Sequence, residues 1–335
     1  LYNPSSKPTI TSAITFKARA IKSGYTSSTV SSALYTVSFS AGDKATFTGS
    51  GVTFKMAYVP SGLTFKAGTG DATVTTVPNP YWIGETQVTY ELWNTVKTWG
   101  TSHSYTFANA GFNGSTGEGS TQQPVVMITW RDAMVWTNAL TEWYNAVNGT
   151  TYTCAYYTDA AYTTPIRAST GSMTITYTTN GSQDAPYVKA DATGFRMAGS
   201  MEWELAARYK GADSSNGAYE WPVGSGKWWT PGSYASGATA TFSDATATGL
   251  VAWYTTNSGD VTNDVKGKAA NALGLYDMSG NVWQYNFDWS TVGSNRVIRG
   301  GSWYDTAVNM RVGYANVYAP YFTNFGTSLR VVKTY

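Results

Sequence analysis

The sequence has very few residues that carry nucleophilic or metal-binding chemistry. Cys154 is its only cysteine and His103 its only histidine. These counts exclude a disulfide framework, a Cys/His zinc site and any Cys–His or Ser-His-Asp nucleophile. We expect Cys154, in the run TYTCAYYT, to be a buried thiol, and His103, which lies between serines, to be a loop residue.

Charge is also scarce. Asp, Glu, Lys and Arg make up 13% of the 335 residues, and the formal net charge is +2. No cluster of Lys and Arg follows a strand or helix along which phosphates could bind, so we expect no nucleic-acid partner. No run approaches the roughly 18 apolar residues that a membrane span needs. A soluble chain is expected, and a removed export signal or an upstream lipid anchor is compatible with it.

Glycine and aromatic residues are abundant instead. The chain has 34 Gly, 25 Tyr and 14 Trp, and 42% of its residues are hydrophobic. This composition is typical of extracellular β-rich proteins, and the length suffices for one large domain or two smaller ones.

Residues 1–45 read as a pair of strands. AITFKARAIKSG and STVSSALYTVSF alternate apolar and polar positions around the turn signal Ser23-Gly24. Two strands cannot bury a core alone. We therefore interpret residues 1–45 as the remnant of an N-terminal immunoglobulin-like or chitobiase-C-terminal-type β module.

Helical spacing is clear in two places after residue 50. TWRDAMVWTNALTEWYNAV (129–147) and GSMEWELAARYKG (199–211) each predict a helix. Between them and after them lie long Gly/Ser/Thr/Asn stretches such as ASGATATFSDATATG (235–249), which we expect to be irregular. The predicted class is α+β, with two main helices, short strands and much irregular structure.

Five sequence blocks carry a family resemblance. In order they are VPNPYWIGETQVTYELWNTV, QPVVMITWRDAMVWTNAL, FRMAGSMEWELAAR, NALGLYDMSGNVWQY, and RVIRGGSWYDTAVNMRV with a closing SLRVV. Residues 50–335 thus resemble the formylglycine-generating-enzyme/sulfatase-modifying-factor family, a variant of the C-type lectin fold. Trp203, Trp283 and Trp303 lie in these blocks, and we expect them to fill the core.

The resemblance also implies where chemistry would lie. Enzymatic members carry two cysteines at the positions of Asp305 and Met310, and neither residue can supply a thiolate. We therefore predict no enzyme activity. A rival reading is an enzyme of this family with altered chemistry, using Asp288, Glu202 and Glu204 as acid/base carboxylates.

A calcium site is the next feature that the resemblance implies. Its ligands would be Asp277, the carbonyls of Gly280 and Val282, and Gln284, which stands where the family has Glu. The alternative is a hydrogen-bonded turn with Asp277 as a local cap. No cofactor is required, and a structural calcium ion is the one that the family implies.

The sequence is most similar to one branch of this fold, the variable proteins of diversity-generating retroelements, of the treponemal type. In that branch a GGSW block opens the variable region, here about 295–335, and a block matching Leu329-Arg330 closes it. The process substitutes adenines and cannot create Lys, Gln, Glu, Met or Trp from an Asn codon ending in C. Between Tyr304 and Ser328, Met310 is the only residue of these types.

The stretch NVYAPYFTNF (316–325) allows two interpretations. The spacing of Tyr318, Tyr321, Phe322 and Phe325 fits one face of a helix, yet Pro320 and Gly326 would confine a helix to about one turn. Rings with few rotamers beside Asn, Thr and Asp are also typical of a binding surface. We predict ligand contacts at ten positions: Tyr304, Asp305, Thr306, Tyr314, Asn316, Val317, Tyr318, Tyr321, Thr323 and Phe325.

The leading hypothesis is a non-enzymatic display protein, secreted or on a bacterial cell surface. Its hypervariable, Tyr-rich site would bind a protein or a glycan, and a monomer is expected. A calcium-dependent carbohydrate-binding lectin is the alternative, with ring stacking by Tyr318 or Tyr321. It lacks the paired acid-and-Asn loop that would coordinate sugar hydroxyls.

Overall fold

The computed structural model describes residues 14–21, 23–35 and 38–335. The chain divides into two compact units, Leu1–Ser40 and Ala41–Tyr335. In the first unit β1 (Ile14–Ala18) pairs antiparallel with β2 (Ser31–Tyr35). The division falls a few residues before the predicted boundary at residue 45, because β3 (Lys44–Gly49) pairs with the next strand, β4 (Val52–Val59), of the second unit. That the first unit is the remnant of a larger module stays a prediction.

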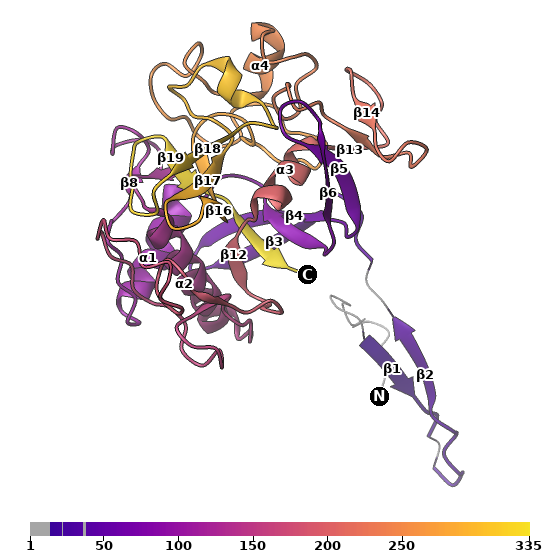
Figure 1. Ribbon diagram of the computed structural model, residues 1–335. Coiled ribbons are helices and arrows are strands. Elements are labelled where there is room, and N and C mark those ends of the chain that lie inside the picture. Colours follow the sequence, from indigo (N-terminus) through magenta and orange to yellow (C-terminus); the bar gives the residue numbers. More distant parts are fainter. Residues whose placement is uncertain (1–13, 22, 36–37) are drawn as a thin grey trace. The chain divides into compact units, whose positions relative to one another are not determined.

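A five-stranded antiparallel sheet forms one layer of the second unit (Figure 1). Its order is β12 (Phe195–Met197), β20 (Val331–Thr334), β7 (Tyr81–Gly84), β4 and β3. β20 follows all the other strands in the sequence, yet it lies inside the sheet. Val332 pairs with Arg196 on one side and with Ile83 on the other.

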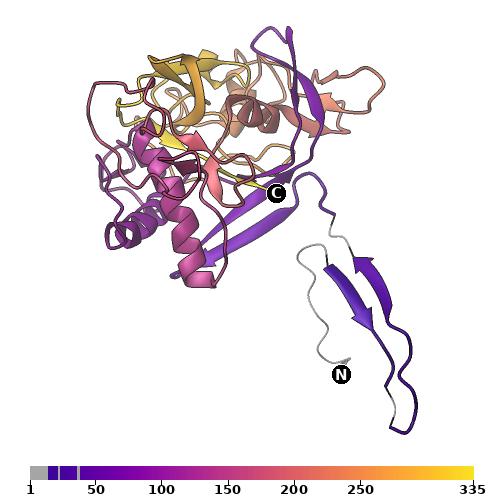
Figure 2. The ribbon, with the colours of Figure 1, turned by 60° about the horizontal axis from the view of Figure 1, so that its bottom comes forward.

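Two helices pack on each other and against this sheet, as Figure 2 shows. They are α1 (Tyr90–Thr101) and α2 (Trp130–Asn148). α2 begins at a capping box in which Thr129 and Asp132 exchange side-chain and backbone hydrogen bonds, and ends at Gly149, whose φ is +66°. The prediction of a helix over 129–147 is confirmed.

Two helices, α1 and α4 (Ala245–Val251), were not predicted from the sequence. α1 carries two signals of a helix. The Thr89 side chain accepts a hydrogen bond from the backbone N–H of Leu92. Three residues, Leu92, Trp93 and Val96, are buried on one face. α4 begins inside the stretch expected to be irregular. Asp244 caps it through the backbone N–H of Ala247, at 2.9 Å.

A four-stranded sheet forms the second layer. Its order is β18 (Ala315–Tyr318), β17 (Asn295–Arg299), β16 (Trp283–Thr291) and β19 (Thr327–Leu329), and β16 and β19 are parallel. α3 (Ser200–Arg208) packs against β16 and β17 and against the hairpin of β5 (Leu63–Ala67) and β6 (Thr73–Val77). α3 confirms the second predicted helix.

Short strand pairs complete the second unit. They are β8 (Phe112–Asn113) with β9 (Val125–Val126), β10 (Tyr156–Tyr157) with β11 (Tyr187–Val188), and β13 (Tyr209–Gly211) and β14 (Tyr219–Glu220) on either side of β15 (Trp228–Trp229). A 3-10 turn, η1 (Ala307–Met310), follows the second layer's β17. The predicted mixture of helices, short strands and irregular structure is confirmed.

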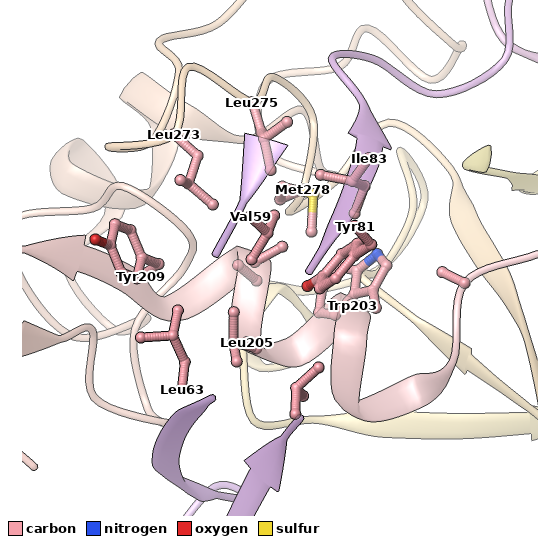
Figure 3. Close-up of a cluster of buried hydrophobic side chains, with 14 of the residues drawn as sticks. Val59, Leu63, Tyr81, Ile83, Trp203, Leu205, Tyr209, Leu273, Leu275 and Met278 are labelled. Carbon is pink, nitrogen blue, oxygen red and sulfur yellow. The ribbon is translucent and has the colours of Figure 1, made fainter. Parts of the chain in front are cut away.

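A large hydrophobic cluster lies between the five-stranded sheet, α3 and the β5–β6 hairpin (Figure 3). Val59 and Ile83 from the five-stranded sheet pack with Trp203 and Leu205 of α3 and with Met278. Trp203 is fully buried and Trp283 is 1% exposed, so both fill the core as predicted. Trp303 is half-buried, and its place is described below.

Lys333 of β20 is a buried cation, 9% exposed, whose ammonium lies 4.4 Å from the ring centroid of Tyr152. Burial lowers its pKa from 10.5 to about 8. Above pH 8 the folded chain has lost this proton while the unfolded chain still holds it, so stability rises with pH. We expect the free energy of unfolding to rise by about 1 kcal/mol between pH 7 and pH 9 through this group.

Urea unfolding at the two pH values measures this rise. The Lys333→Met variant should lack it, whereas Lys227→Met, at an exposed lysine, should retain it. An equal rise in Lys333→Met and in the wild type would contradict the assignment.

Candidate ligand-binding surface

The segment from Trp303 to Gly326 contains no helix over 316–325. β18 ends at Tyr318 and pairs with β17, Val317 opposite Val297 and Asn316 opposite Ile298. A turn follows, closed by the N–H of Phe322 on the carbonyl of Ala319 at 3.0 Å. The interpretation as a core helix is therefore wrong, because strand pairing and a turn produce the ring spacing.

Rings from three parts of this segment form one contiguous group with a ring from β8. Tyr318 lies 4.6 Å from Phe322, Trp303 lies 4.9 Å from Tyr304, and Phe112 lies 5.9 Å from Phe325, all between ring centroids. Burial raises the pKa of Tyr304, and the adjacent hydroxyl of Tyr318 raises that pKa further. The Trp303–Tyr304 pair therefore lies next to the Tyr318–Phe322 pair. We call the group the aromatic surface; its members are Phe112, Trp303, Tyr304, Tyr318, Phe322 and Phe325.

Much of the aromatic surface faces solvent. Tyr304 is 40% exposed, Phe322 41%, Phe325 42% and Phe112 45%. Large rings exposed together are uncommon on a monomeric protein and mark sites of interaction. No charged side chain belongs to the group.

The backbone beneath these rings is held by the scaffold. Asn324 accepts hydrogen bonds from the N–H of Gly326 and the hydroxyl of Thr327, and its amide donates to the Tyr318 hydroxyl at 3.0 Å. The Tyr285 hydroxyl donates to the carbonyl of Phe322 at 2.7 Å. The loops are thus fixed through polar atoms while the rings stay partly free.

Two further hydrogen bonds hold the same loops in place. The indole N–H of Trp303 donates to the carbonyl of Phe325 at 2.9 Å, and the N–H of Met127 donates to the carbonyl of Asn324 at 3.1 Å. A Cβ at Gly326 would lie 2.3 Å from the ring of Tyr304. Only glycine at 326 lets that ring lie where it does.

The ten predicted contact residues all lie on or beside this segment, and none is fully buried. Tyr304, Thr306 and Phe325 are exposed, and the others are half-buried: Asp305, Tyr314, Asn316, Val317, Tyr318, Tyr321 and Thr323.

Asp305 and Tyr314 both contact Trp283 beneath the surface. Asp305 accepts hydrogen bonds from the indole N–H of Trp283 at 2.7 Å and from the amide of Asn309 at 2.7 Å. Tyr314 packs on Trp283, with 6.2 Å between ring centroids. Both support the surface from beneath, and ligand contact by any of the ten stays a prediction.

Three members of the aromatic surface were absent from the predicted set. Phe322 lies in the stretch 316–325, which supplied six of the predicted contacts, and it could have been included. Trp303 was assigned to the core because of its block. Phe112 comes from β8, more than 200 residues earlier in the chain, and no sequence signal joins it to Phe325.

The positions of the family's two cysteines hold structural side chains. Met310 is fully buried in a cluster with Ala235, Val251 and Tyr254. Cys154 is 4% exposed beside α2, and burial raises the pKa of its thiol. A neutral buried thiol is a poor nucleophile.

The carboxylates of the rival enzyme reading are also engaged. Glu202 pairs with Arg196 at 2.6 Å, and Glu204, fully buried, pairs with Arg208 at 2.7 Å and with Arg299 at 2.9 Å. Asp288 accepts a hydrogen bond from the backbone N–H of Ser200.

The arginines of the family blocks differ in their partners. Arg299 pairs with Glu204. The guanidinium of Arg330 donates to Gln284 and to the carbonyls of Gly84 and Tyr276. The Nε of Arg311 donates to the carbonyl of Val308.

The four predicted calcium ligands are brought together, but their chemistry does not fit the ion. The carbonyls of Asp277, Gly280 and Val282 all accept hydrogen bonds from the amide of Gln87. Gln284 turns its NH₂ group toward the carbonyl of Asp277, at 3.0 Å. The oxygen of Gln284 accepts from Trp203 and Arg330 and is not available as a ligand.

The remaining carboxylate, that of Asp277, accepts a hydrogen bond from the backbone N–H of Lys266 at 2.9 Å. Burial raises the pKa of Asp277 to about 6. Among the described residues no group of three or more His, Cys, Asp or Glu side chains is arranged to hold a metal ion. The alternative of a hydrogen-bonded turn matches the contacts better.

A family model of the sulfatase-modifying factor enzyme 1-like domain matches residues 47–335. The chain belongs to this family. A curated relative, the chaperone protein LppX of Paenibacillus barcinonensis, is 27% identical over 293 residues, covering 81% of this chain and 85% of the relative.

Solved structures show the same fold. Variable protein 1 of Treponema denticola is similar with a TM-score of 0.62 and 26% identity, over 87% of this chain and 99% of that one. CarF is similar with a TM-score of 0.57 and 22% identity, over 84% of this chain and 98% of that one. The resemblance to the treponemal variable proteins and the sulfatase-modifying-factor variant of the C-type lectin fold are thereby confirmed.

Within the described residues, the family member has no helix long and apolar enough to cross a membrane.

Proposed function

We propose that this family member is a non-enzymatic display protein that binds a protein or glycan through the aromatic surface. The main support is the contiguous group of rings above loops that hydrogen bonds hold in place. Four of the rings are 40% to 45% exposed: Tyr304, Phe322, Phe325 and Phe112. Rings with few rotamers on a fixed backbone lose little conformational entropy on binding. A location outside the cell, secreted or on the cell surface, belongs to the same proposal.

The similarity to a treponemal variable protein supports this function. So does the use of both cysteine positions for structural purposes, since Asp305 and Met310 leave no thiolate for the family's oxidative chemistry. A calcium-dependent lectin is less well supported, because the sequence lacks the paired acid-and-Asn loop that would coordinate sugar hydroxyls.

Binding should depend on the exposed rings while folding should not. The double variant Tyr304→Ala/Phe325→Ala is expected to lower the binding affinity at least tenfold. Aromatic side chains that become buried on binding supply much of the binding energy of a protein interface. Each substitution should lower the free energy of unfolding by no more than about 1 kcal/mol, as expected of exposed positions. Tyr162→Ala is the matched control, at a ring 40% exposed on another part of the surface.

Glycan arrays and arrays of purified extracellular proteins measure the first effect, and thermal unfolding measures the second. Equal binding by the double variant and the wild type would refute the proposal.

Sequencing the source locus tests diversification separately. A near-identical copy of the codons for 295–335 beside a reverse transcriptase, differing only at adenines, is the expected result.

A further inference from the structure

The turn at 277–282 directs three backbone carbonyls at one point. Asp277, Gly280 and Asn281 have φ values of +53°, +82° and +62°. A Cβ at Gly280 would lie 2.3 Å from the carbonyl oxygen of Trp253, so this shape requires glycine there. Convergent carbonyl oxygens are a typical ligand set for a hard cation.

The point where these carbonyls converge is taken by the amide nitrogen of Gln87. It lies 3.1, 3.0 and 2.8 Å from the carbonyl oxygens of Asp277, Gly280 and Val282. These are hydrogen-bond lengths, longer than the roughly 2.3–2.6 Å of calcium ligation. Gln87 is 1% exposed, so water cannot replace its side chain without opening the fold.

The orientation of the amide is fixed by the same contacts. Turned over, its oxygen would face three carbonyl oxygens with no hydrogen between them, which is repulsive. Its own oxygen, and one carboxylate oxygen of Asp277, are buried without a hydrogen-bond partner among the described residues. The site thus retains oxygen atoms that no internal donor uses.

We propose that the side-chain amide of Gln87 replaces a calcium ion at this turn, so that the unit 41–335 folds without calcium. The amide supplies hydrogens to carbonyls that a cation would otherwise neutralise. A single change of Gln87 to a carboxylate should restore the requirement, because an anion facing three carbonyl oxygens needs a cation between them.

Thermal unfolding in excess EDTA and in millimolar CaCl₂ tests this on the full chain. The wild type should unfold at the same temperature in both solutions. Gln87→Glu should unfold at a lower temperature in EDTA, and calcium should raise its midpoint by roughly 5 °C or more. Gln183→Glu, the same change at a half-buried glutamine that exchanges hydrogen bonds with Thr170, should show no calcium response.

Two results would overturn the proposal. One is a wild type that loses stability in EDTA and recovers it with calcium. The other is a folded Gln87→Glu variant whose midpoint calcium does not change. Because the wild-type comparison needs no substitution, the proposal stays testable if Gln87→Glu does not fold.

Discussion

Replacing Glu204 by alanine should lower the free energy of unfolding by about 3–5 kcal/mol, the cost of leaving buried charges without their partner. Glu204 is fully buried and lies between two guanidinium groups, those of Arg208 and Arg299, at 2.7 and 2.9 Å. It also accepts the N–H of Gly68 at 2.7 Å, which ties the end of β5 to α3. Alanine removes all of these contacts at once.

Denaturant unfolding of matched variants measures this effect. Glu204→Gln keeps an oxygen for Gly68 but loses the charge, so its stability should lie between those of Glu204→Ala and the wild type. Glu118→Ala, at an exposed glutamate, should change stability by less than about 0.5 kcal/mol. If Glu204→Ala were as stable as Glu118→Ala, the pairs would contribute nothing to the fold.

Replacing Trp203 by alanine should be similarly costly, at about 3–5 kcal/mol. The ring is fully buried in the hydrophobic cluster of Figure 3, and its N–H donates to Gln284 at 2.8 Å. Gln284 holds Arg330 through the same oxygen, at 2.7 Å. The substitution therefore leaves a cavity and weakens a buried polar network.

A conservative variant separates the two contributions. Trp203→Phe retains most of the ring and loses the hydrogen bond, so it should cost about 1–3 kcal/mol less than the alanine variant. Trp228→Ala, at a half-buried tryptophan of β15, is the control and should be better tolerated. Equal losses at 203 and 228 would show that the core is not organised around Trp203.

Local patterns predicted what depends on local physics. α2 and α3 followed from apolar spacing and capping residues, and both lie where the spacing placed them. The ring spacing of 316–325 suggested a helix, but the segment begins with a strand. Pairing of β18 with β17 overrides a short helical pattern. The loss of both cysteines was readable directly, since it depends on residue identity alone.

Long-range contacts account for what the sequence did not predict. Phe112 meets Phe325 only because β8 and the 319–326 loop come together in the folded chain. Gln87 lies 190 residues before the carbonyl of Asp277 to which it donates, and it was absent from the predicted calcium ligands. Neither contact leaves a periodic or compositional signal.

The position of β20 has a consequence for how the protein is made. A chain that stops within 303–326 lacks β19 and β20, which leaves β7 and β12 without the neighbour they share and exposes two strand edges. The five-stranded sheet can close only after the ribosome has translated through the segment that bears the aromatic surface. A truncated chain would therefore carry unpaired strand edges, which are templates for aggregation, in place of the completed sheet.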